Sequence, residues 1–424
     1  MGSLYHLFWR KDPILRRIFV ICVLTDVALA SLVPFVNLYM SDELKAPSEI
    51  TGLAFGGYLA VETLFKAPAG ALSDRWGRKT VLMGGLAIGV LAASLMGLCQ
   101  VHSLFLFLFP LAGLSVAAVF PAMAALMADH TVEAERSTVM GVLNLSYNAG
   151  LAVSAAGGFF VHELVGTYRF NFFGTALALT LALVLAGLLL SSHQPVGGIG
   201  PAKTGNWKRI PLKALSPPLL TLAAIMGLSQ FGLAMLVPIV VPFAKKVVHL
   251  SDTSMGIGIV AATTIWAIAS VPLARFSDRF GREEMIKLAL LLGAVCFFCV
   301  PIIADLGLSL ALLPVALLAG SAWLLAFPAA LALGSELVSD NEKGTAVGLI
   351  YGGQGVGAAL GAPTGGFFHK AVYLLTRDEP LSLTVPFVAS GLILLMAFVT
   401  SFFLSRQIRS WLAASAGEDP YPQE

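Results

Sequence analysis

The chain has 424 residues, of which 57% are hydrophobic and only 12% are charged. A soluble globular chain carries about 25% charged residues, so this composition excludes an ordinary soluble protein. With 26 basic and 24 acidic residues, the net charge of +2 excludes a protein that coats nucleic acid through a basic field. At about 20 apolar residues per crossing, this length accommodates about twelve membrane-spanning helices.

Apolar runs between charged or turn-rich breaks predict twelve transmembrane helices, and therefore an all-α membrane protein. The first six are expected at 17–38, 50–71, 80–101, 104–128, 137–162 and 169–191. The other six are expected at 217–243, 253–274, 285–304, 308–333, 344–369 and 382–405. The predicted domains are an N-terminal six-helix bundle (1–191), a linker rich in Gly, Pro and Lys (192–216), a C-terminal six-helix bundle (217–405) and a tail (406–424).

The lysine and arginine residues predict the orientation of these helices. If the N-terminus is cytoplasmic, 19 of the 26 basic residues fall on cytoplasmic segments and 6 on outer segments. This bias follows the positive-inside rule. We therefore expect a multi-pass protein of the cell (inner) membrane with both termini and the linker in the cytoplasm.

The second half of the chain repeats the first. At an offset of 204 residues, Pro34 aligns with Pro238 and the segment 73–78 (SDRWGR) aligns with 277–282 (SDRFGR). At an offset of 207, Gly150 aligns with Gly357. Because each half has six helices, the two copies share one membrane orientation. Such 6+6 parallel repeats bind substrate near the midplane between the halves.

The segment between the second and third helices resembles the G-x-x-x-D-R-x-G-R-K signature of the major facilitator superfamily. Its residues are Gly70, Asp74, Arg75, Gly77, Arg78 and Lys79, and a weaker second copy has Asp278, Arg279, Gly281 and Arg282. The resemblance implies a secondary transporter that alternates between inward- and outward-open states. It also implies that these charged turns act as a conformational latch between the bundles.

Two further signatures of the family's antiporters are incomplete here. The glycine ladder of helix five is degraded, whereas helix eleven retains it better, and both sets are interpreted as a packing hinge: Gly141, Gly150, Gly158, Gly348, Gly357, Gly361 and Gly365. The helix-four arginine of the drug–proton antiporters is replaced by Phe109. Proton coupling through that arginine is therefore excluded.

Three ionisable residues lie deep in the predicted spans: Asp26, Glu62 and Lys66. Each costs roughly 2.5–3.5 kcal/mol at a helix centre, so each needs a partner or an aqueous cavity. Glu62 and Lys66 are spaced i, i+4 and can pair on one helix face. The equivalents of the three in the second half are Gln230, Trp266 and Ser270, so the charge is confined to the N-terminal bundle.

Two interpretations of these charges remain open. In the first, Asp26 or Glu62 takes up and releases a proton, since a carboxylate that loses its water favours the neutral form and a nearby ammonium favours the ionised form. In the second, Glu62 and Lys66 form a permanent structural pair and Asp26 is hydrogen-bonded to a neighbouring helix. Further candidates for lining the cavity are Asn37, Tyr58, Asn144, Tyr147, Asn148, Gln230 and Trp266.

The hypothesis that follows is a monomeric, proton-coupled exporter of a small, partly apolar molecule, whose partners are that substrate, protons and the lipid bilayer. The alternatives are a carrier or flippase of amphipathic, lipid-like substrates, with Lys66 binding an anionic head group, and a facilitator of metabolite uptake. No enzyme, metal site or cofactor is expected, because the histidines lie at or near loops and termini, and Cys296 and Cys299 lie in an apolar run with no second pair. No nucleic-acid partner is expected either.

Overall fold

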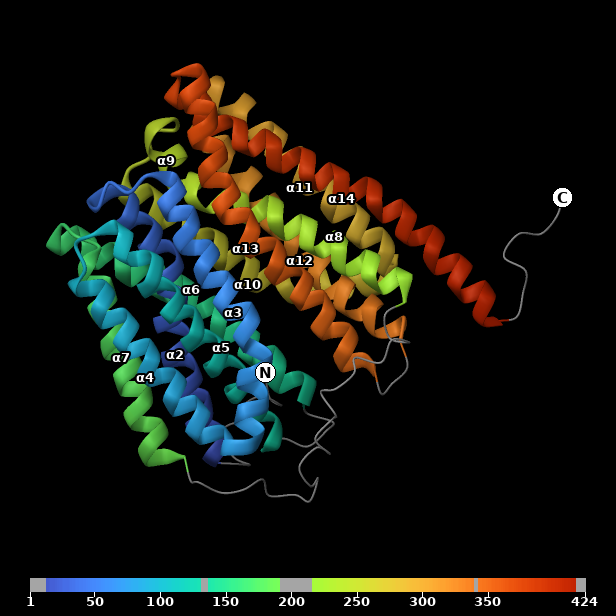
Figure 1. Cartoon of the computed structure of the whole chain (residues 1–424), viewed down its shortest axis with the longest axis horizontal. Coiled ribbons are helices and arrows are strands. Elements are labelled where there is room, and N and C mark those ends of the chain that lie inside the picture. The colour runs from blue at the N-terminus through green and yellow to red at the C-terminus, as the bar shows by residue number, and fades with distance from the viewer. Residues whose placement is uncertain (1–12, 131–135, 191–215, 339–341, 417–424) are drawn as a thin grey trace. The chain divides into compact units, whose positions relative to one another are not determined.

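A computed structural model describes residues 13–130, 136–190, 216–338 and 342–416. Within these ranges the side chains of 13, 128, 136–145, 148, 267, 270–279, 309 and 412–416 lie outside the description. Helices make up nearly all of the described chain (Figure 1). The expected all-α fold class is confirmed.

Twelve predicted spans correspond to thirteen α-helices in the described ranges. The first six are α2 (Pro13–Leu38), α3 (Ser48–Trp76), α4 (Arg78–Leu98), α5 (Phe105–Asp129), α6 (Arg136–Val165) and α7 (Arg169–Leu189). The others are α8 (Pro217–Met235), α9 (Val237–Lys246), α10 (Asp252–Phe280), α11 (Arg282–Asp305), α12 (Leu312–Glu336), α13 (Lys343–Thr376) and α14 (Glu379–Ala416).

The seventh predicted span differs from the others because it contains two helices. The chain breaks at Leu236 between α8 and α9, next to Pro238. Proline has no backbone N–H to donate to the carbonyl four residues earlier, so it interrupts the helical hydrogen bonding. Its repeat mate Pro34 lies inside the continuous α2, so a proline at this position permits the break without forcing it.

Eight segments of the described chain are long and apolar enough to cross a membrane by length and composition. They are Ile14–Glu43, Arg78–Leu98, His102–Met127, Arg169–Leu189, Pro217–Lys246, Arg282–Asp305, Leu312–Glu336 and Glu379–Trp411. Helices α3 and α13 are more polar because they carry several glycines and hydrophilic side chains. Helix α3 holds Tyr58, Glu62 and Lys66, and α13 holds the ladder glycines of the second half.

The described helices group into two compact units. One unit holds the described residues up to Leu190 together with Leu250–Ala267, and the other holds the described residues from 216 to His249 and from Ile268 onward. Inside the first unit α2 packs on α6 and α7, and α4 packs on α5 and α7. Inside the second unit the repeat-related pairs recur, since α8 packs on α13 and α14, and α11 packs on α12 and α14. The domain boundaries at 191, 217 and 405 stay predictions.

The two charged turns have the same backbone form in both halves. Gly77 has φ +92° between α3 and α4, and Gly281 has φ +91° between α10 and α11. Only glycine adopts this region without steric cost, so the glycine of each turn is required by the backbone. The repeat therefore extends to individual dihedral angles.

Candidate functional site

Asp26 lies in the interior of the first unit, with only 2% of its surface exposed. The hydroxyl of Ser146 on α6 donates a hydrogen bond of 2.6 Å to Asp26 Oδ2. Helix α6 reaches α2 closely because position 150 is glycine: a Cβ at Gly150 would lie 2.9 Å from the Asp26 carbonyl carbon. Asp26 therefore has one buried hydroxyl partner, and the described residues supply it with no ion pair.

Ser146 is a site residue that the sequence interpretation missed, although it named the neighbouring Tyr147. Its contact with Asp26 joins positions 120 residues apart, and no local pattern marks it. The one signal was the ladder glycine Gly150, one helical turn further along, which indicated a close helix approach.

Glu62 and Lys66 pair with each other on α3, as their i, i+4 spacing indicated. The Lys66 Nζ to Glu62 Oε1 distance is 2.7 Å, and the side chains of Lys66 and Glu62 are 40% and 20% exposed, respectively. Lys66 is thus accessible while it is paired. One turn before Glu62, the Tyr58 ring stacks on the fully buried Phe109 ring at 4.4 Å. The place of the family's arginine is therefore filled by an aromatic stack.

The other candidates for lining the cavity are spread over the first unit and α8. Asn37 is buried, and Tyr147 is exposed with its ring 5.9 Å from that of Phe120. Trp266 is partly buried on the part of α10 that belongs to the first unit. Asn144 and Asn148 lie on α6, and their side chains are outside the described set, as is that of Ser270.

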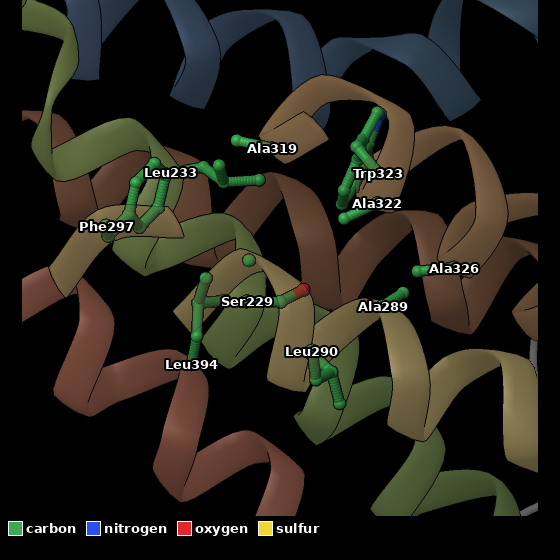
Figure 2. A pocket seen from close by; sticks show the side chains of 11 residues that line it. Ser229, Leu233, Ala289, Leu290, Phe297, Ala319, Ala322, Trp323, Ala326 and Leu394 are labelled. Atoms are coloured by element: carbon green, nitrogen blue, oxygen red, sulfur yellow. The ribbon is translucent and has the colours of Figure 1, made fainter. Parts of the chain in front are cut away.

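The second unit contains a small, partly open pocket of about 30 Å³, shown in Figure 2. It is lined by Ser229, Leu233, Ala289, Leu290, Gly293, Phe297, Ala319, Ala322, Trp323, Ala326 and Leu394. The Trp323 ring stacks on Phe327 at 5.6 Å, and Phe327 meets the exposed Tyr351 edge-on at 5.4 Å. An aromatic row thus extends from the pocket to the surface of this unit.

Two amide side chains in the second unit have buried atoms without a hydrogen-bond partner among the described residues. They are Gln230 Oε1 on α8 and Gln354 Nε2 on α13, and Gln354 is only 7% exposed. Gln354 was missed by the sequence interpretation, although the 207-residue offset aligns it with the named Tyr147. An unpartnered buried amide is costly, so each of these positions favours a bound water or a polar ligand group.

The charged turn at the end of α3 forms ion pairs that its sequence did not specify. Arg78 contacts Asp74 at 3.5 Å and also pairs with Asp129 at the end of α5. In the second unit, Arg282 pairs with Glu336, which is the repeat mate of Asp129. An ion pair therefore joins the first turn to the end of α5 and the second turn to the end of α12. The side chains of Asp278 and Arg279 lie outside the described set, and Arg75 is exposed.

We expect replacement of Arg78 by glutamine to destabilise the first unit by about 1 kcal/mol. The reason is that Arg78 is the cation shared by Asp74 and Asp129, and a half-buried pair contributes on that scale. The matched control is Arg75→Gln in the same turn, which removes an exposed cation. Thermal unfolding should separate the two variants, and equal effects on stability would contradict an ion-pair role for Arg78.

The ladder glycines of α13 allow it to approach the α8 backbone. A Cβ at Gly357 would lie 1.9 Å from the Gly227 carbonyl oxygen, and one at Gly365 would lie 1.8 Å from that of Met235. The corresponding distance for Gly361 is 2.3 Å, to the Phe231 carbonyl oxygen. Two real Cβ and oxygen atoms cannot come so near, so these glycines are needed for the crossing.

Several other hinge candidates behave differently. A Cβ at Gly158 would overlap the Phe35 ring at 2.0 Å, which is a side-chain contact. At Gly70, which belongs to the latch candidates and not to the hinge candidates, a Cβ would meet only Pro121 at 3.9 Å. Gly348 departs from the packing interpretation, because a Cβ there would meet no heavy atom within 4 Å. Gly348 lies on the open side of α13. Gly141 is outside the described side chains.

One family profile covers most of the chain. A family profile described as Major Facilitator Superfamily matches residues 18–362. Multidrug resistance protein 2 of Bacillus subtilis (strain 168) is 28% identical over 57% of this chain, and the match spans 62% of that relative's length. Multidrug resistance protein MdtH of Yersinia pestis (strain Pestoides F) is 25% identical, with 90% of this chain and 92% of the relative covered.

Solved structures of transporters share the fold at low sequence identity. A bacterial homologue of the human lysosomal transporter Spinster, in an inward-facing and occupied conformation, has a TM-score of 0.75 with 15% identity and covers 94% of this chain and 98% of its own. A point mutant of the nucleoside transporter NupG has a TM-score of 0.74 with 12% identity, covering 92% of this chain and 100% of its own. At these identities the likeness concerns the fold alone.

Proposed function

Because the chain belongs to the major facilitator superfamily and is a membrane transporter, we propose that it exports a small, partly apolar molecule in exchange for protons. Asp26 is the proposed proton-carrying residue. The proposal also places the protein, as a monomer, in the cell's inner membrane with both termini in the cytoplasm. Two curated relatives named multidrug resistance proteins support export of such molecules.

The burial of Asp26 is the observation that carries this proposal. A carboxylate that is 2% exposed and has a hydroxyl as its hydrogen-bond partner lacks the compensation that a buried charge needs. Its protonation therefore depends on whether water reaches it. If water reaches Asp26 first from one side of the membrane and then from the other, Asp26 can take up a proton on one side and release it on the other.

Glu62 and Lys66 suit a second role, at the surface that meets the substrate. Their charges are already mutually compensated, and both side chains are partly exposed. A polar group on the substrate can therefore exchange with one partner of the pair without leaving a buried charge. The pair would recognise substrate while Asp26 carries the proton.

Reconstitution in proteoliposomes tests the proposal. Fluorescent hydrophobic dyes, both cationic and neutral, would be added to vesicles with and without an imposed pH gradient. Dye should accumulate only when the gradient is present, and a protonophore should abolish that accumulation. Accumulation at the same rate without a gradient would contradict proton coupling.

The half-exposed ammonium of Lys66 favours a second candidate, a carrier of anionic amphiphiles. A fluorescent lysophospholipid with an anionic head group is the probe for it. If this candidate holds, transport of that probe should persist without a pH gradient and should fall when Lys66 is replaced by glutamine. Under the first proposal, the probe is not carried in the absence of a gradient.

A further inference from the structure

The end of the first unit that is remote from the charged turns holds a histidine in an acidic and aromatic setting. His162, near the end of α6, has Nε2 3.3 Å from Oδ2 of Asp252, the first residue of α10. The His162 ring stacks on Tyr168 with centroids 3.7 Å apart and planes 3° from parallel. The side chains of His162 and Asp252 are 20% and 31% exposed, so the medium can reach both.

Two more contacts hold the start of α10 against α6 beside this pair. The Thr253 hydroxyl donates to Glu163 Oε2 at 3.0 Å. Gly256 lies under the Phe159 ring, where a Cβ would be 2.7 Å from the nearest ring carbons. We call these residues the α6–α10 contact: Phe159, His162 and Glu163 on α6, and Asp252, Thr253 and Gly256 on α10.

The charged and titratable groups around His162 are mostly acidic. Besides Asp252 and Glu163, the carboxylates of Asp42 and Glu43 lie near the Tyr168 ring, and Glu43 accepts hydrogen bonds from the Tyr168 backbone N–H and the Thr167 hydroxyl. Burial, with Asp252, Asp42 and Glu43 adding to it, raises the pKa of Tyr168, so its phenol stays neutral.

Arg169 brings a cation to the same region. Arg169 follows Tyr168, and its Nε donates to the Gly97 carbonyl on α4. Histidine is the side chain that ordinarily changes charge between about pH 5 and 8. His162 is the histidine of this set.

We propose that His162 is a proton-operated clasp that holds the start of α10 on α6 more tightly as the medium at this end becomes acidic. A neutral imidazole gives Asp252 one hydrogen bond, whereas an imidazolium adds the attraction of an ion pair in a half-buried site with further carboxylates nearby. Helix α10 has residues in both units. A weaker contact between its start and α6 would therefore release a helix that belongs to both.

The consequence for transport rests on the proposed function. The orientation predicted from the basic residues places this end on the outer side of the membrane. An acidic exterior would therefore slow the opening of this end even as it supplies the protons that drive exchange. The contact of His162 with Asp252 would therefore lower the transport rate at low external pH.

Engineered disulfides test the clasp without any substrate. A Cβ built at Gly256 lies 3.1 Å from Phe159 Cβ, so Phe159→Cys with Gly256→Cys is close enough to cross-link. The four native cysteines, Cys22, Cys99, Cys296 and Cys299, are replaced by serine in this background. Cross-linking rates are then compared between His162 and His162→Gln versions at the same pH, so that the pH dependence of thiol reactivity cancels.

The expected ratio of the two rates is about threefold in favour of His162 near pH 5.5 and about one near pH 8, the scale of a half-exposed ion pair. A second pair, Glu163→Cys with Thr253→Cys and a short bis-maleimide, repeats the measurement if the first pair fails to fold. A ratio that is the same at both pH values would overturn the proposal.

His369→Gln is the matched control, because His369 is the repeat mate of His162 on α13. It should leave the cross-linking ratio unchanged, and an equal effect of both substitutions would overturn the clasp. The transport assay gives the second readout: His162→Gln should remove an approximately threefold slowing at acidic external pH. Because cross-linking needs neither substrate nor proton gradient, failure of the clasp and failure of the transport proposal are distinguishable.

Discussion

Replacement of Asp26 by asparagine is expected to abolish transport driven by a proton gradient while leaving the protein folded. Asparagine has nearly the same shape, and its carbonyl oxygen can still accept the hydrogen bond from Ser146. It cannot take up a proton. Because the buried site then holds a neutral group, the melting temperature should stay the same or rise. The measurement is dye accumulation in proteoliposomes with and without a pH gradient, beside thermal unfolding.

Glu62→Gln is the matched control for this experiment. It also neutralises a carboxylate of the first unit, but that carboxylate is partly exposed and already paired with Lys66. Its effect should fall on substrate affinity, with the gradient dependence retained. If Asp26→Asn kept gradient-driven accumulation, or if only Glu62→Gln removed it, Asp26 would not be the proton carrier.

Replacement of Gly357 by alanine is expected to destabilise the second unit by about 3 kcal/mol, near the upper end of the usual cost of overpacking. The added methyl group would lie 1.9 Å from the Gly227 carbonyl oxygen, which is backbone and has no rotamer to change. Helices α8 and α13 would have to separate along the whole crossing. Thermal unfolding followed by size-exclusion chromatography in detergent measures the loss.

The same substitution at Gly348 has the opposite expected sign. A methyl group there meets open space, and alanine is the better helix former by up to about 1 kcal/mol. Gly348→Ala should therefore be neutral or slightly stabilising. Similar losses from both substitutions would contradict the close-contact account of Gly357, because helix propensity alone favours alanine at both positions.

The spans and the repeat were predictable because they depend on local composition. A helix of the bilayer has to be apolar over about 20 residues, so its extent can be seen in one stretch of sequence. The ends moved outward mainly where polar or charged residues continue the helix, as in α3, which reaches Trp76, and α14, which reaches Ala416. The break at Leu236 was not predictable, because Pro34 occupies the position equivalent to Pro238 in an unbroken helix.

The candidate site was predictable only in part. The pairing of Glu62 with Lys66 follows from the geometry of one helix and could be anticipated. Contacts between helices could not be, and they include Ser146 with Asp26, Arg78 with Asp129, and His162 with Asp252. Each joins residues whose approach depends on the packing of several helices at once.

By itself, the sequence determined that this protein is a membrane transporter with twelve predicted spans in two repeated halves. It also placed three charges deep in the spans of the first half. These conclusions depend on hydropathy, repeat offsets and motif residues, which are properties of the chain alone. Only the tertiary structure decided how those charges differ. Asp26 is buried and accepts a hydrogen bond from Ser146, whereas Glu62 and Lys66 remain partly exposed. The physical reason is that solvent access to a side chain depends on which helices cover it, and that covering is set by side-chain shape over long sequence separations.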